Sequence, residues 1–167
     1  MNEIRVVLWG FGAMGSGIAR VLLQKRGVAI KGVCDLHPER AGKSMYTLLG
    51  IDRHEHSEVI ISADIETVLF PGCADVCMVA TDSFTKNAFP KIRRALECGV
   101  NVICTAEEMS FPAAKEPLLA SELDRIAKEN GVTVLGTGIN PGLMMDLLAV
   151  CLSGCMTETT KITCKRV

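Results

Sequence analysis

A glycine-rich turn near the amino terminus carries the clearest chemical signal in this sequence of 167 residues. The pattern G-x-G-x-x-G runs from Gly10 through Gly12 to Gly15, directly after an apolar run and directly before a segment of helical period. Gly10 permits a tight turn, Gly12 lets the backbone approach a phosphate, and Gly15 allows a helix to pack closely on a strand. Unpaired N–H groups at the start of that helix would face the anion. The pattern therefore predicts a site for the pyrophosphate of a dinucleotide.

An acidic residue at the right distance supports this prediction. Asp35 ends the second apolar run, 20 residues after Gly15, where a carboxylate can accept hydrogen bonds from the adenosine ribose. Because a carboxylate repels the 2′-phosphate of NADP, Asp35 favours NAD as the cofactor. His37 and Arg40 lie close by and weaken that preference, so the use of NADP stays open.

Three further apolar runs also end in polar residues. The sequences at these ends are Ala80-Thr81-Asp82-Ser83, Thr105-Ala106-Glu107-Glu108 and Gly136-Thr137-Gly138-Ile139-Asn140-Pro141-Gly142. In a parallel sheet such ends gather at one edge, where they would surround the nicotinamide half of the cofactor. Asp82 and Glu107 are the candidates for a catalytic base that takes a proton. Structural interpretations stay open as well: Asp82 and Asn140 as helix caps, and Glu107 as a solvated loop acid.

Other kinds of active site lack their residues in this sequence. Neither G-x-S-x-G nor H-E-x-x-H occurs, and the eight cysteines include no C-x-x-C pair. The three histidines, His37, His54 and His56, lie in one polar part of the chain. We interpret the cysteines as reduced, small core side chains and predict no metal site.

Composition and charge narrow the choice of partners. Eighteen Lys and Arg against 19 Asp and Glu give a net charge of −1, and aromatic residues make up 4% of the chain, which disfavours nucleic acid. The apolar stretch 143–152 is interrupted by Asp146 and is shorter than the roughly 20 residues of a membrane span. We therefore expect a cytoplasmic protein with a small-molecule substrate, and no membrane partner.

Alternating strands and helices must position these residues. Apolar, β-branched runs predict strands at 4–9, 28–34, 59–62, 76–80, 101–105, 132–136 and 159–165. Segments of helical period predict helices at 13–25, 38–49, 64–70, 84–97, 117–130 and 143–152. This alternation predicts an α/β fold with a doubly wound parallel sheet of the Rossmann type.

The motifs together resemble the 2,4-diaminopentanoate dehydrogenase family, which is related to the dihydrodipicolinate reductase type of Rossmann oxidoreductase. The stretches that carry the resemblance are the glycine-rich turn with its flanks, the segment from Val33 to Arg40, and the three polar strand ends. The resemblance implies NAD(P)-dependent oxidative deamination of 2,4-diaminopentanoate to 2-amino-4-oxopentanoate and ammonia, a reaction of ornithine degradation.

The same resemblance implies roles for individual residues. The pyrophosphate would be held by Gly10, Phe11, Gly12, Ala13, Met14 and Gly15. Asp35 would hold the ribose. The nicotinamide side would be lined by Ala80, Thr81, Asp82, Thr105 and Glu107. Asn140 would lie at the hinge toward the substrate.

The resemblance also predicts the domain organisation. Members of the family continue into a substrate-binding domain that roughly doubles the chain. We therefore expect a dinucleotide-binding domain at 1–142, and at 143–167 a hinge helix and first strand leading to a substrate domain that is missing or truncated. The chain alone would then be inactive, and the full-length form a homo-oligomer. Two alternative functions stay open: a dihydrodipicolinate reductase-like reductase and a non-catalytic NAD-binding module.

Overall fold

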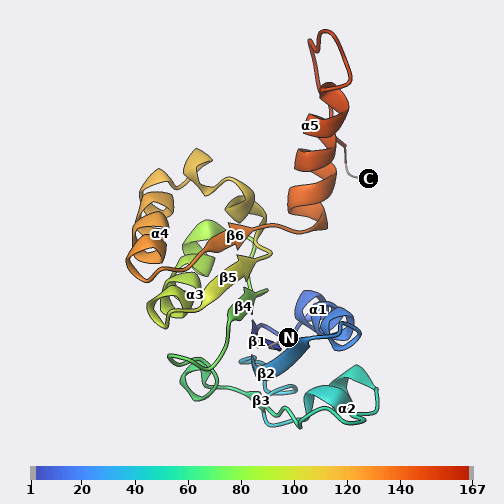
Figure 1. Cartoon of the computed structure of the whole chain (residues 1–167), viewed down its shortest axis with the longest axis vertical. Coiled ribbons are helices and arrows are strands. Elements are labelled where there is room, and N and C mark those ends of the chain that lie inside the picture. Colours follow the sequence, from blue (N-terminus) through green and yellow to red (C-terminus); the bar gives the residue numbers. More distant parts are fainter. Residues whose placement is uncertain (1–2, 166–167) are drawn as a thin grey trace.

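The computed structural model describes residues 3–165, and the ends of the expected segments 1–142 and 143–167 lie outside that range. Its centre is a six-stranded sheet in the order β3-β2-β1-β4-β5-β6, in which all neighbouring strands are parallel (Figure 1). The strands are β1 (Ile4–Trp9), β2 (Val28–Cys34), β3 (Ile61–Ser62), β4 (Val76–Val79), β5 (Asn101–Cys104) and β6 (Val134–Gly136). This order is the doubly wound Rossmann topology, so the predicted fold class is confirmed.

Helices cover both faces of the sheet. The α-helices are α1 (Ala13–Leu23), α2 (Met45–Leu49), α3 (Thr85–Glu97), α4 (Pro117–Glu129) and α5 (Leu148–Ser153). Short 3-10 turns form η1 (Ile65–Thr67), η2 (Glu107–Ser110) and η3 (Pro112–Ala114), and a π-helical segment forms η4 (Ile139–Leu147). Neighbouring residues of β1 enter two different cores: Val7 packs with side chains of α3 and α4, and Val6 and Leu8 pack with those of α1 and α2. The central strand is therefore buried on both faces, as the doubly wound fold requires.

Two predicted helices are longer in the prediction than in the structure. The helix expected at 38–49 is confined to α2, since Gly42 donates its N–H to the carbonyl of Ile61, and Lys43 accepts from the N–H of Ile61. The helix expected at 64–70 is the single turn η1.

The carboxyl-terminal part also differs from the prediction. Residues 159–165 form no strand in the described chain, where no β-strand pairs with them. Helical structure begins earlier than 143, at η4, and continues into α5, which extends away from the sheet (Figure 1). Within residues 3–165, no helix combines the length and the apolar character that crossing a membrane would demand.

Candidate functional site

The glycine-rich turn joins the end of β1 to the start of α1. Gly10 has a φ of +100°, and a Cβ atom there would lie 2.6 Å from the carbonyl oxygen of Ala80. A Cβ atom on Gly15 would lie 1.9 Å from the carbonyl oxygen of Gly10, so only glycine lets α1 pack this closely on the turn. At Gly12, by contrast, a Cβ atom would meet nothing within 4 Å. The turn is therefore tight on its inner side and open at Gly12.

The amino terminus of α1 offers hydrogen-bond donors at this open place. Its N-cap residue is Gly12, and no side chain caps the helix. Ala13 and Met14 in its first turn are exposed. The first N–H groups of a helix have no partner within the helix and lie at the positive end of its dipole. The arrangement fits the pyrophosphate of a dinucleotide.

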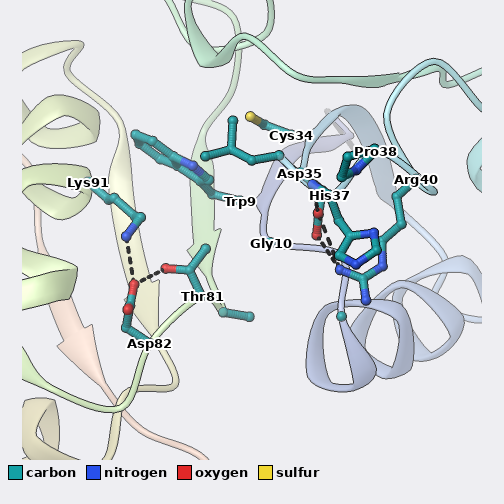
Figure 2. A pocket seen from close by; sticks show the side chains of 13 residues that line it. Trp9, Gly10, Cys34, Asp35, His37, Pro38, Arg40, Thr81, Asp82 and Lys91 are labelled. Carbon is teal, nitrogen blue, oxygen red and sulfur yellow. Dashed lines mark hydrogen bonds and ion pairs between the residues drawn. The ribbon is translucent and has the colours of Figure 1, made fainter.

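Asp35 ties this turn to the end of β2. It is 9% exposed, and its Oδ2 accepts from the Phe11 N–H at 2.6 Å while its Oδ1 accepts from the His37 N–H at 2.8 Å. The Arg40 guanidinium lies 3.2 Å from Oδ2 (Figure 2). Burial alone would raise the pKa of Asp35, but the two backbone donors and Arg40 outweigh it, so the pKa is lowered from 3.8. Asp35 is therefore an ionised carboxylate at neutral pH.

A cavity of about 580 Å³ opens at the carboxyl ends of β1, β2 and β4. It is lined by Trp9, Gly10, Gly12, Cys34, Asp35, Leu36, His37, Pro38, Arg40, Ala80, Thr81, Asp82 and Lys91 (Figure 2). Six of the predicted site residues thus share one cavity: Gly10, Gly12, Asp35, Ala80, Thr81 and Asp82. A second cavity, of about 470 Å³, includes Phe11, Ala13, Arg40 and Lys43 in its lining. Arg40 lines both cavities.

Asp82 is held by a partner that the sequence did not reveal. Its Oδ2 accepts from Lys91 Nζ at 2.6 Å and from Thr81 Oγ1 at 2.7 Å. Burial would raise the pKa of Asp82, but the bonds from Lys91 and Thr81 outweigh it and lower the pKa. Lys91 lies on α3, and sequence reasoning missed it because it belongs to no motif. A helix after β4 places it nine residues beyond Asp82, back toward the same loop.

The remaining predicted residues lie outside this cavity. Met14 is exposed on α1, and Gly15 is buried against the turn. Thr105 follows β5 and donates its N–H to Val79 at 3.0 Å. Glu107 is exposed on η2, Asn140 is half-buried on η4, and these two elements contact each other. The structure therefore separates the two candidate bases, with Asp82 in the cavity and Glu107 beside η4.

Glu108 has a structural role next to Glu107. Its Oε2 accepts from the Thr85 N–H at 3.0 Å, and its Oε1 from Lys115 Nζ at 2.8 Å. The Lys115 ammonium, together with the Thr85 N–H, lowers the pKa of Glu108. The carboxylate of Glu108 thus binds the start of α3 to the segment after β5.

The cysteines fall into two groups. Cys34, Cys77, Cys98 and Cys104 are buried, as expected of small core side chains, and Cys73 is half-buried. Cys151, Cys155 and Cys164 are exposed, so the core interpretation is wrong for them. Burial, and to a lesser extent Asp35, raises the pKa of the cavity residue Cys34 to about 11. Its thiol is therefore protonated at neutral pH and is no nucleophile.

The fold, the open glycine turn and the position of Asp35 define a Rossmann nucleotide-binding domain. Over 167 residues the chain is 49% identical to 2,4-diaminopentanoate dehydrogenase from Acetoanaerobium sticklandii, covering 100% of this chain and 47% of that protein. It is 24% identical over 176 residues to an amine dehydrogenase from Streptomyces virginiae, covering 98% of this chain and 46% of the relative. The chain spans about half the length of these curated relatives. The resemblance to 2,4-diaminopentanoate dehydrogenases is thus confirmed along all of this chain. No family model matches it.

Solved structures share the fold of this chain. The structure of an amine dehydrogenase from Mycobacterium smegmatis has a TM-score of 0.78 at 33% identity, covering 91% of this chain and 44% of that one. GenD2 from gentamicin A biosynthesis, solved in complex with NAD, has a TM-score of 0.61 at 21% identity and covers 81% of this chain and 34% of that one. The second likeness shows the fold alone.

Proposed function

We propose that this chain is the cofactor-binding part of an NAD(P)-dependent enzyme that deaminates 2,4-diaminopentanoate oxidatively. The products would be 2-amino-4-oxopentanoate, ammonia and the reduced cofactor. The observation that carries the proposal is the 49% identity, along all of this chain, to 2,4-diaminopentanoate dehydrogenase. The open glycine turn beside the Asp35 carboxylate supports the cofactor part of the proposal independently.

The residues of the turn would hold the dinucleotide. The backbone from Gly10 to Gly15, with the first N–H groups of α1, would bind the pyrophosphate. Asp35 would face the adenosine ribose. The chemistry that a bound nicotinamide would supply is that of an acceptor for the hydride from the amine-bearing carbon of the substrate.

We propose that NAD is preferred and that NADP also binds. The ionised Asp35 favours a free ribose 2′-hydroxyl over a 2′-phosphate. Arg40 lies 3.2 Å from Asp35 and lines both cavities, and Lys43 lines the second one. These two cations would offset the repulsion between Asp35 and a 2′-phosphate.

Of the two candidate bases, we propose Glu107 as the proton acceptor. Asp82 is paired with Lys91, and its lowered pKa makes it a weak base. Glu107 is exposed after β5, and among residues 3–165 no ion pair engages its carboxylate. It would take a proton from the substrate nitrogen as the carbon loses its hydride. Water would then hydrolyse the resulting imine to the ketone and ammonia.

The chain's carboxyl-terminal part would connect to the substrate side. We propose that 1–142 bind the dinucleotide, with Thr105 near the nicotinamide and Asn140 at the hinge toward the substrate, and that 143–167 pack against a substrate-binding domain. The exposed apolar side chains of Leu147, Val150 and Leu152 support this role. A cytoplasmic location fits the free cysteines.

Activity is tested on a protein that carries both halves, by mixing it with NAD and 2,4-diaminopentanoate and following the absorbance of the reduced nicotinamide. The Glu107→Gln variant should turn over at least about 100-fold more slowly while its NAD affinity stays the same. The matched control is Glu129→Gln, an exposed residue at the end of α4, which should change neither. NAD binding without any turnover in a protein that carries both halves would instead support the non-catalytic module.

A further inference from the structure

The cavity of about 580 Å³ has polar residues at two opposite ends (Figure 2). Asp35 and Arg40 form one end, and Asp82 and Lys91 form the other. The lining also includes three large apolar side chains, those of Trp9, Leu36 and Pro38. Leu36 is 76% exposed although it lines a cavity. A cavity with this lining suits a flat group that has apolar faces and a polar edge.

If the proposed function is right, the flat group is adenine, and it lies in the cavity between Asp35 and the pair of Asp82 and Lys91. Asp35 would face the adenosine ribose, and the pyrophosphate would lie at the glycine turn. The base is attached to that ribose, and the cavity continues from Asp35 past Trp9 to Asp82 and Lys91. The polar pair at its far end therefore lies where it can meet an edge of the base.

The donors and acceptors of this pair are complementary to adenine. The bonds that Asp82 accepts from Lys91 and Thr81 both use Oδ2, and the Asn87 side chain also bonds the carboxylate. A carboxylate has about four acceptor sites, so Oδ1 can accept a further bond. An ammonium has three N–H donors. In the described part of the chain Lys91 uses two of them, on Asp82 at 2.6 Å and on the carbonyl of Asn87 at 3.2 Å. An edge of adenine presents an amino donor next to a ring-nitrogen acceptor.

We infer that Asp82 and Lys91 are specificity-determining residues that recognise the edge of adenine. The Asp82 carboxylate accepts from the exocyclic amino group, and Lys91 donates to N1, the neighbouring nitrogen of the Watson–Crick edge, which in hypoxanthine carries a hydrogen and cannot accept. This role rests on the proposed function. It assigns Asp82 to the adenosine end of the cofactor, whereas the sequence prediction placed it beside the nicotinamide.

A cofactor analogue tests this role without any catalytic readout. In nicotinamide hypoxanthine dinucleotide a carbonyl oxygen replaces the amino group, so an acceptor would face the Asp82 carboxylate. Titration calorimetry on the 167-residue chain should show NAD binding at least about tenfold more tightly than this analogue.

Two variants should reduce the preference for NAD over the hypoxanthine analogue. Asp82→Asn keeps the shape, but its amide can present either a donor or an acceptor, so the ratio of the two affinities should fall toward one. Lys91→Met removes the donor and should also narrow the ratio. The matched controls are Asp124→Asn and Lys128→Met, since Lys128 Nζ and Asp124 Oδ2 form an equally short pair of 2.6 Å on the exposed face of α4. Both controls should keep the wild-type ratio.

The outcomes separate this inference from the proposed function. If the folded wild-type chain binds neither dinucleotide, the proposed function fails. If the wild type binds both equally, or if Asp82→Asn weakens both by the same factor, the pair only holds the loop to α3 and the inference is overturned. Thermal unfolding checks that each variant folds. If Asp82→Asn does not fold, the ratio of the two affinities in Lys91→Met tests the inference: a smaller ratio supports it, and an equal weakening of both dinucleotides overturns it.

Discussion

Asp35 joins three parts of the site through its two carboxylate oxygens. One oxygen holds the Phe11 N–H of the glycine turn, the other holds the His37 N–H after β2, and Arg40 reaches both. Hydrogen bonds to a charged group are worth about 1.5–3 kcal/mol each when the group is buried. This carboxylate therefore has a structural role before any ribose arrives.

The Asp35→Asn variant should lose this anchoring. We expect the free energy of unfolding at pH 7 to fall by about 1–3 kcal/mol, because two amides and Arg40 lose a charged acceptor. The pKa of Asp35 is lowered in the folded state, so its contribution is fully present above the unfolded value near 3.8 and is lost as the pH falls through the folded value. Denaturant unfolding between pH 7 and pH 2 measures the difference. A difference that stays constant over that range would contradict the assigned role.

Arg40 should matter more for NADP than for NAD. The Arg40→Ala variant removes a cation that would meet a 2′-phosphate, so we expect NADP affinity to fall about tenfold or more and NAD affinity to change little. Arg53→Ala is the matched control, since Arg53 is exposed and pairs weakly with Glu58 at 4.0 Å. Equal losses for both cofactors in Arg40→Ala would exclude a 2′-phosphate contact.

Among the elements, α1 has glycines at positions where the packing of the protein does not require glycine. The helix contains two glycine positions, the N-cap Gly12 and the interior Gly17, where an added Cβ atom would meet nothing within 4 Å. Neither position has a positive φ. The protein alone thus gives no steric reason for glycine at either place.

Alanine at these two positions should therefore have different effects. Gly17→Ala should raise the free energy of unfolding by about 0.5–1 kcal/mol, because alanine is the better residue in a helix interior, and should leave NAD affinity unchanged. Gly12→Ala should fold normally but bind NAD at least about tenfold more weakly, because its methyl group occupies the open approach to the pyrophosphate. Thermal unfolding and calorimetry measure the two effects. Normal NAD binding by Gly12→Ala would count against the assigned pyrophosphate site.

The helices and strands differ in how well local sequence pattern predicts them. The glycine turn, the first two strands and α1 follow from local spacing, and the structure has them close to where the pattern predicts them. The short α2 was not predictable, because residues 42–44 bond to a segment near Ile61 that lies far along the chain. Lys91 was missed because it belongs to no motif, and only the fold of the loop before α3 brings it back to Asp82. The expected strand at 159–165 would have required a pairing partner that local pattern cannot supply.

At the scale of the whole molecule, the exposed apolar surface of η4 and α5 stands out. Leu143, Met144, Leu147, Val150 and Leu152 are all about half exposed or more. Exposed apolar side chains that gather along one helical segment are typical of an interface. In the longer relatives, the additional half of the chain would offer such a cover.

The 167-residue chain should therefore self-associate as its concentration rises. Light scattering should show an increase in mean mass, and Leu147→Glu with Val150→Glu should suppress it, because two carboxylates would have to be desolvated in the contact. Leu118→Glu serves as the control, since Leu118 is 84% exposed on α4, outside this surface. A chain that stays monomeric at high concentration would contradict this expectation.

A calorimetric titration of the wild-type chain with NAD tests whether the glycine turn binds a dinucleotide. We expect saturable binding at a single site with a dissociation constant of roughly 1 μM to 1 mM, and the loss or marked weakening of this binding in Gly12→Ala but not in Gly17→Ala. A chain that is folded by thermal unfolding and yet shows no saturable NAD binding would contradict this expectation.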